Sequence, residues 1–226
     1  MQCSVRKVRR RAAATVGFLA VLATGAAAIE SQADFVFDAL GPAACEVPPP
    51  SFDIAQFRAF ADGNPDAPIA RGEIGGTIES AFAGGGLYGA DEAGGFVVGV
   101  QGMLLDDAAD VTMLCLVLTR LGDFDAKAGA IVGEAGMGAA GDGSFLGVFK
   151  LVRRDGDGRA ATFASGTVER GEASFGMFDG ILVEGSITIE GAYTLVGSEE
   201  ARPLTARITI PRAENVLRPA LRLSRG

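Results

Sequence analysis

Short β-rich runs separated by glycine and aspartate fill the chain after residue 66, and no helical period is sustained there. Runs of this kind, each ended by turn-forming residues, are typical of the strands of an all-β domain. We therefore predict an all-β fold, an antiparallel β-barrel or sandwich of roughly eight to ten strands with one short N-terminal helix. The predicted strands are residues 72–82, 95–105, 111–121, 129–134, 144–153, 159–170, 173–184, 186–196 and 204–210.

Two of these runs allow more detailed predictions. Residues 111–121 are apolar at successive positions, so we expect a central strand that is buried on both faces. Glu184-Gly185 predicts the turn of a hairpin that joins residues 180–184 to the following run.

The chain divides by composition into four parts. Residues 1–28 form a leader, residues 29–63 an N-terminal extension with a Pro-rich stretch, residues 64–211 the β domain, and residues 212–226 a basic C-terminal tail. We expect this tail to fray, because terminal segments are poorly ordered unless something holds them.

One short helix is expected over residues 51–62, after the three prolines at 48–50. Its apolar residues roughly follow a helical stripe. Ser51 can cap its first turn, and Gly63 can end it.

The leader has the pattern of a secretory signal peptide, with a basic head, an apolar middle and small residues at its end. Cleavage is expected after Ala28 or after Ala33, and Arg10-Arg11 leaves a twin-arginine export route open beside the general one. A retained membrane anchor is the alternative, since the uncharged run approaches the length of a membrane span. We expect the mature protein to be periplasmic or secreted and not embedded in the membrane.

Removal of the leader makes an acidic protein more acidic. The chain has 20 basic and 28 acidic residues, and without the 5 basic residues of the leader the balance is 15 against 28, a net charge of −13. Such a protein repels nucleic acid and anionic lipid headgroups. We interpret this charge as a source of solubility. Recognition of a cationic partner or of a bound cation is the alternative explanation.

Two cysteines remain after the leader, because Cys3 lies within it. An even number of cysteines in an oxidising compartment predicts a disulfide between Cys45 and Cys115. This bond would close a loop of about 70 residues and stabilise the fold by roughly 4 kcal/mol in the chain-entropy model. Two unpaired thiols are the alternative.

The absence of histidine excludes more chemistry than any other property of the composition. It removes Ser-His-Asp and Cys-His catalysis and most zinc, copper and non-haem iron sites. The chain also has no tryptophan and only two tyrosines, which disfavours platforms for stacking sugars or bases. We therefore predict no catalytic residue, no cofactor site and no metal site.

Two acidic clusters resemble cation sites, but each has a simpler interpretation. The Asp-Gly repeat at residues 155–158 resembles the start of a calcium loop, yet no third ligand follows in register and arginine comes next. Asp-Gly pairs accept the positive φ angles of tight turns, so the repeat predicts a hairpin tip. Asp106, Asp107 and Asp110 are expected in a solvated connection between strands.

The function that these observations favour is a non-enzymatic binding or structural module. The interior of the β domain or an open sheet face would hold a small apolar ligand or a protein partner. A hydrolase that uses carboxylates alone is one alternative. A small outer-membrane β-barrel is another, although aromatic girdles of the kind that such barrels carry are not evident in the sequence.

The leader predicts where the exported protein begins. Its first residue should be Ile29 or Asp34, because both follow small residues at the positions that signal peptidase reads. N-terminal sequencing of the exported protein measures this start. Recovery of the protein from a membrane fraction with Met1 still in place would contradict the prediction.

Overall fold

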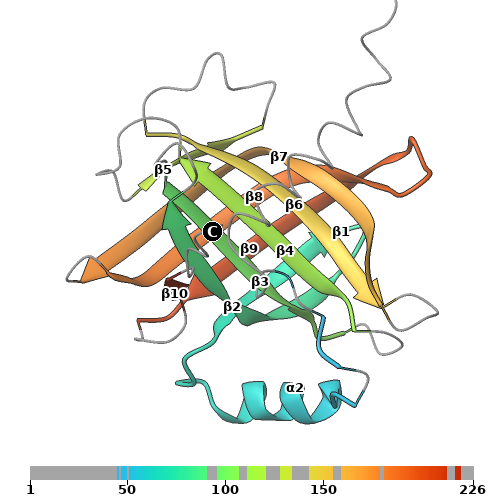
Figure 1. Ribbon diagram of the computed structural model, residues 1–226, viewed down its shortest axis with the longest axis horizontal. Helices are drawn as coiled ribbons and strands as arrows, with labels where there is room; N and C mark the ends of the chain where they lie inside the picture. The colour runs from blue at the N-terminus through green and yellow to red at the C-terminus, as the bar shows by residue number, and fades with distance from the viewer. Residues whose placement is uncertain are drawn as a thin grey trace, which may run out of the picture.

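The computed structural model describes residues 45, 47–49, 51–90, 96–106, 111–120, 128–133, 143–154, 159–178, 181–212 and 217–219. This part of the chain contains one helix, α2 (Ile54–Gly63), and a ten-stranded sheet (Figure 1). The strands are β1 (Ala70–Gly76), β2 (Ser80–Ala90), β3 (Phe96–Leu104), β4 (Met113–Arg120), β5 (Ala128–Val132), β6 (Phe145–Arg154), β7 (Ala160–Phe178), β8 (Ile181–Leu195), β9 (Ala201–Ile210) and β10 (Leu217–Pro219).

The sheet closes on itself. All strands except β5 and β10 pair antiparallel with their neighbours in chain order, and β1 pairs with both β2 and β9. We call this closed series, β1–β2–β3–β4–β6–β7–β8–β9, the ring. The all-β prediction with one short N-terminal helix is confirmed.

The two remaining strands fill gaps in the ring. β5 lies between β6 and β7, parallel to the first and antiparallel to the second. β1 pairs with β2 only as far as Gly84, and β10 pairs in parallel with β2 beyond that point, at residues 86–88. Residues 217–219 are therefore held by the sheet and do not fray as expected, because β2 has an edge there that β1 leaves open.

Two apolar clusters stabilise the ring. The interior cluster takes side chains from every strand of the ring and from β5, and it includes large, fully buried residues such as Phe82, Phe145 and Phe149. The outer cluster lies on the outside of β2, β3, β4 and β6.

β4 belongs to both clusters, because side chains of a strand alternate between its faces. Leu114, Leu116 and Leu118 are in the interior cluster, whereas Cys115 and Val117 are in the outer one. The prediction of a central strand buried on both faces is confirmed.

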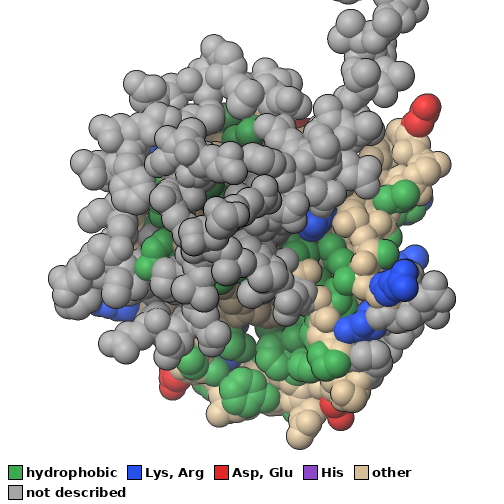
Figure 2. All heavy atoms as spheres, in the orientation of Figure 1, with side chains coloured by type: hydrophobic (Ala, Val, Ile, Leu, Met, Phe, Trp, Pro, Cys, Tyr) green, Lys and Arg blue, Asp and Glu red, His purple; other side chains and the backbone are tan. Residues whose placement is uncertain are grey.

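The N-terminal segment covers the outer cluster. We call the described residues between Cys45 and Asn64 the strap. The strap contributes Cys45, Val47 and Ala61 to the outer cluster, and Phe57 of α2 packs against it. In Figure 1, α2 lies at one end of the ring beside β2 and β3, and Figure 2 shows hydrophobic side chains gathered in the same region.

The helix begins later than the sequence predicted. Its N-cap is Asp53, whose Oδ1 accepts a hydrogen bond from the backbone N–H of Gln56 at 2.9 Å. Ser51 does not cap the helix, because the chain first makes a turn in which Phe52 N–H donates to Pro49 O at 2.9 Å. At the other end, Asn64 Nδ2 donates to Phe60 O at 2.8 Å.

The run predicted as one strand over residues 72–82 contains the end of β1, a turn and the start of β2. The glycine-rich residues that follow, left as a connection by the sequence, form the rest of β2. Glycine is required there, since a side chain at Gly84 would overlap the backbone of Gln101 on β3. Glycine has a low preference for strands, so the sequence did not predict a strand here, although the closeness of β3 requires glycine.

The runs over residues 159–170 and 173–184 are not separate strands. β7 is one 19-residue strand that continues through a register shift between Val168 and Arg170. The turn predicted at Glu184-Gly185 is wrong, because both residues lie within β8 and pair with β7. The hairpin tip predicted at residues 155–158 lies outside the described residues.

The interior packing predicts that Gly102 tolerates no side chain. A methyl group there would lie 2.5 Å from the ring of Phe82 and 2.6 Å from the carbonyl oxygen of Ala83. Gly102→Ala should lower the free energy of unfolding by about 1–3 kcal/mol, measured by urea denaturation.

Gly63→Ala is the matched control, because nothing lies within 4 Å of a methyl group at that position. Its free energy of unfolding should stay within about 0.5 kcal/mol of the unmodified protein or rise slightly. Equal losses in both variants would contradict the interior packing.

Candidate functional site

The outside of β1, β9, β8 and β7 is polar and exposed, in contrast to the side under the strap. Along β9, Leu204, Ala206 and Ile208 are buried, whereas Thr205 and Arg207 between them are exposed. This alternation is typical of a sheet with one face on the core and one in solvent.

The strand register places the outward side chains in rows that cross the strands. Because directly paired residues point to the same face, each row brings together residues distant in the sequence. One row contains Glu73, Arg207, Thr188 and Glu172, and the next contains Gly75, Thr205, Glu190 and Arg170. Within the second row, Arg170 Nε donates to Glu190 Oε2 at 2.7 Å.

A groove of about 710 Å³ lies across these rows. Its polar lining residues are Glu73, Glu79, Ser80, Asp106, Thr188, Glu190, Thr205 and Arg207. A second hollow of about 430 Å³ is lined by residues of β5, β7 and β8 and also borders Thr188. The two hollows together border β1, β9, β8, β7 and β5, so they follow the polar side of the ring.

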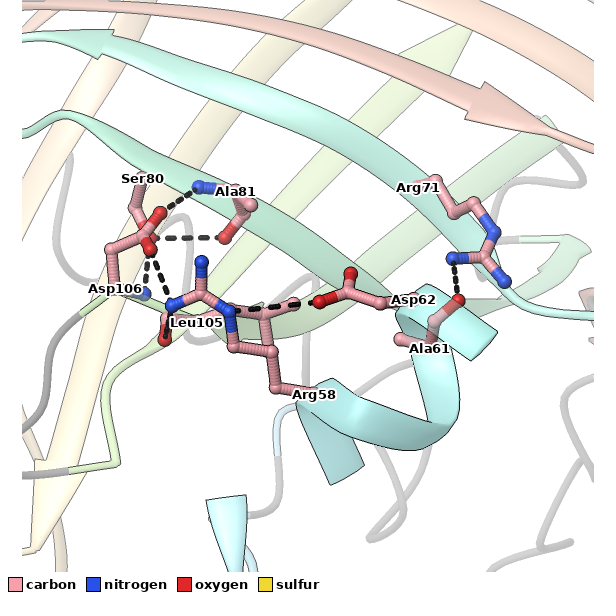
Figure 3. A network of polar contacts seen from close by, with 8 residues as sticks. All are labelled: Arg58, Ala61, Asp62, Arg71, Ser80, Ala81, Leu105 and Asp106. Atoms are coloured by element: carbon pink, nitrogen blue, oxygen red, sulfur yellow. Dashed lines mark hydrogen bonds and ion pairs between the residues drawn. The ribbon is translucent and has the colours of Figure 1, made fainter. Parts of the chain in front are cut away.

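Asp106 joins one end of this groove to the strap (Figure 3). One of its carboxylate oxygens, Oδ2, accepts a hydrogen bond from Ala81 N–H at 2.7 Å. The other, Oδ1, lies 2.6 Å from Nη1 of Arg58 on α2. The backbone N–H of Asp106 donates to Ser80 Oγ at 3.0 Å. The residue thus fixes the β1–β2 turn, the end of β3 and the helix relative to one another.

These contacts determine the ionisation of Asp106. The hydrogen bond from the Ala81 backbone N–H is the main cause that lowers the pKa of this carboxyl below its ordinary value of 3.8. Arg58 and Ser80 lower the pKa further, whereas loss of solvent acts in the opposite direction. The carboxylate is therefore charged at neutral pH and carries the full interaction with Arg58.

The predicted disulfide is present in the structure. Cys45 and Cys115 are bonded, with their Cα atoms 5.7 Å apart. The bond ties the strap to the outer face of β4, the central strand.

Of the predicted acidic clusters, only Asp106 lies among the described residues. Asp107, Asp110 and the repeat at residues 155–158 lie outside them. The sequence placed Asp106 in a solvated connection, but its partner Arg58 is on the helix, and nothing in the local sequence connects the two. Among the described residues, no group of three Cys, Asp or Glu side chains is arranged to hold a metal ion.

Large apolar side chains of the interior cluster pack against one another inside the ring. Phe145 and Phe175 pack edge to face, with ring centroids 5.8 Å apart. Arg120, at the end of β4, is only 4% exposed, and its guanidinium lies 5.0 Å from the centroid of Phe145.

Comparison with known proteins gives no further guidance, because no family model, curated protein or solved structure matches this chain. None of the described helices has the length and apolar character needed to cross a membrane.

The network at Asp106 predicts a dependence of stability on pH. Because the folded-state pKa is lowered, the carboxylate stabilises the fold above pH 3.8, and this contribution disappears as the pH falls through the folded-state value. Asp106→Asn should therefore be less stable than the unmodified protein at pH 7, and the difference should shrink below pH 3.8. Urea denaturation across this pH range measures both effects.

Asp66→Asn is the matched control, since Asp66 is exposed and the substitution makes the same change in charge. It should be nearly neutral at both ends of the pH range. If Asp106→Asn behaves in the same way, the network does not stabilise the fold.

Proposed function

We propose that this protein is an exported, non-enzymatic binding module and that the groove outside β1, β9 and β8 is its binding surface. The observation that carries the proposal is the asymmetry of the ring. One outer side is apolar and covered by the strap, whereas the other is polar, exposed and hollowed by the groove. The described side chains of the interior cluster are apolar and buried, so a polar partner is better suited to the outer groove than to the interior.

The partner that fits this groove is an extended, basic segment of another protein. Glu73 and Glu79 are exposed in the groove and can pair with lysine or arginine side chains. Thr188 and Thr205 add hydroxyl groups that can bond a peptide backbone. The net negative charge of the chain also favours approach of a cationic partner.

Several features support a binding role over hydrolysis. The chain has no histidine to act as general base. Glu73, Glu79 and Glu190, which line the groove, are exposed to solvent, where their carboxylates can pair with charged groups of a partner.

Binding of a short lysine homopeptide to the full mature protein tests the proposal. The double variant Glu73→Gln/Glu79→Gln should bind the peptide about 5-fold more weakly at low ionic strength, because two exposed ion pairs are lost. Isothermal titration calorimetry measures the affinity, and raised salt should weaken binding to the unmodified protein.

The matched control is Glu199→Gln/Glu200→Gln, which removes the same charge from an exposed position outside the groove. This variant should bind almost as well as the unmodified protein. Equal losses in both double variants would mean that the peptide recognises only the overall charge, and the groove would no longer be supported as the site.

A further inference from the structure

Side chains of the ring hold the strap in place. Arg154 of β6 donates from Nε to Pro48 O at 2.9 Å and from Nη2 to Val47 O at 3.0 Å. Gln101 Oε1 accepts a hydrogen bond from the backbone N–H of Cys45. At the helix end, Arg71 Nη1 donates to Ala61 O at 2.7 Å.

The described backbone hydrogen bonds of the strap, in contrast, join its own residues to one another or to the turn that follows it, where Ala67 N–H donates to Asn64 O. Phe52 N–H bonds to Pro49 O, and Phe57 N–H bonds to Asp53 O. The strap therefore does not take part in the strand pairing that closes the ring. It is attached by side chains, by apolar contacts and by one disulfide.

The ring does not need the strap for its own core. The interior cluster contains no residue of the strap, and the apolar contacts of the strap are all in the outer cluster. Local opening of such a unit requires less free energy than global unfolding. The strap can thus leave the outer face while the strands remain paired.

We propose that the strap is a releasable cover that the Cys45–Cys115 disulfide keeps closed. Cys115 is fully buried and Cys45 is only 8% exposed, so the closed strap shields the bond from an attacking thiolate. Opening of the strap must precede reduction. A dithiol then breaks the sulfur–sulfur bond, each cysteine sulfur gains a proton and becomes a thiol, and the dithiol becomes a disulfide.

Reduction changes what the ring presents to solvent. Without the covalent link, the strap opens more often, because its closed state is no longer favoured by the constraint on the chain. Met103, Met113 and Val152 then become accessible on the outer face of β3, β4 and β6. The redox state of the compartment thereby determines how often this apolar face is covered.

The rate of disulfide reduction by excess dithiothreitol tests the order of events. Arg154→Ala removes the charged hydrogen bonds to Val47 and Pro48 and should accelerate reduction about 10-fold, because the strap opens more often. Arg153→Ala is the matched control. Arg153 lies over the ring of Phe163, 4.6 Å from its centroid, so its loss makes the same change in charge and should leave the reduction rate unchanged.

Hydrogen exchange of the Cys45→Ser variant provides a second test. Amides of α2 should exchange at least 10-fold faster than in the disulfide-bonded protein, whereas amides of β8 and β9 should keep their protection. Equal reduction rates in Arg153→Ala and Arg154→Ala would overturn the proposal. Loss of protection in β8 and β9 together with α2, or complete unfolding of Cys45→Ser, would also overturn it, because the strap would then open only with the ring.

Discussion

The pairing of β1 with β9 is the constraint on which the rest of the structure depends. It joins the first strand of the ring to the last, with Ile74 opposite Ala206 and Arg71 opposite Thr209. Closure gives each strand of the ring one inward face, and the interior cluster draws on all of them. It also satisfies backbone groups that an open sheet would leave exposed at its two edges.

Closure of the ring also gives the sheet an outer face, and the polarity of that face differs between its two halves. Many outward residues of β3, β4 and β6 are apolar, and the strap covers them. Most outward residues of β1, β9 and β8 in the rows of the groove are hydroxyl-bearing or charged and remain in solvent. Asp106 lines the groove and forms an ion pair with Arg58 of the strap. This one residue therefore connects the proposed binding surface to the proposed cover.

The sequence predicted the features that depend on local pattern. Residues 111–121 were apolar at successive positions, and β4 is buried on both faces. The Cys45–Cys115 bond followed from counting cysteines. The glycines of β2 were misread because their role is set by the closeness of β3, and the length of β7 was missed because a register shift continues it. The groove depends on register: Glu73 and Thr188 share a row only because β9 lies between their strands.

Because the first strand of the ring pairs with the last, the ring can close only near the end of synthesis. Each strand of the ring from β2 onward can pair with the ring strand before it as the chain emerges during synthesis. The pairing of β1 with β9 cannot form until residues 204–209 have been made, and β10, which pairs with β2, comes later still along the sequence. Contacts between such distant segments form slowly, since a long loop must close before they stabilise anything. Until then the growing sheet has unpaired edges, and a chaperone that shields strand edges would be most useful during that interval.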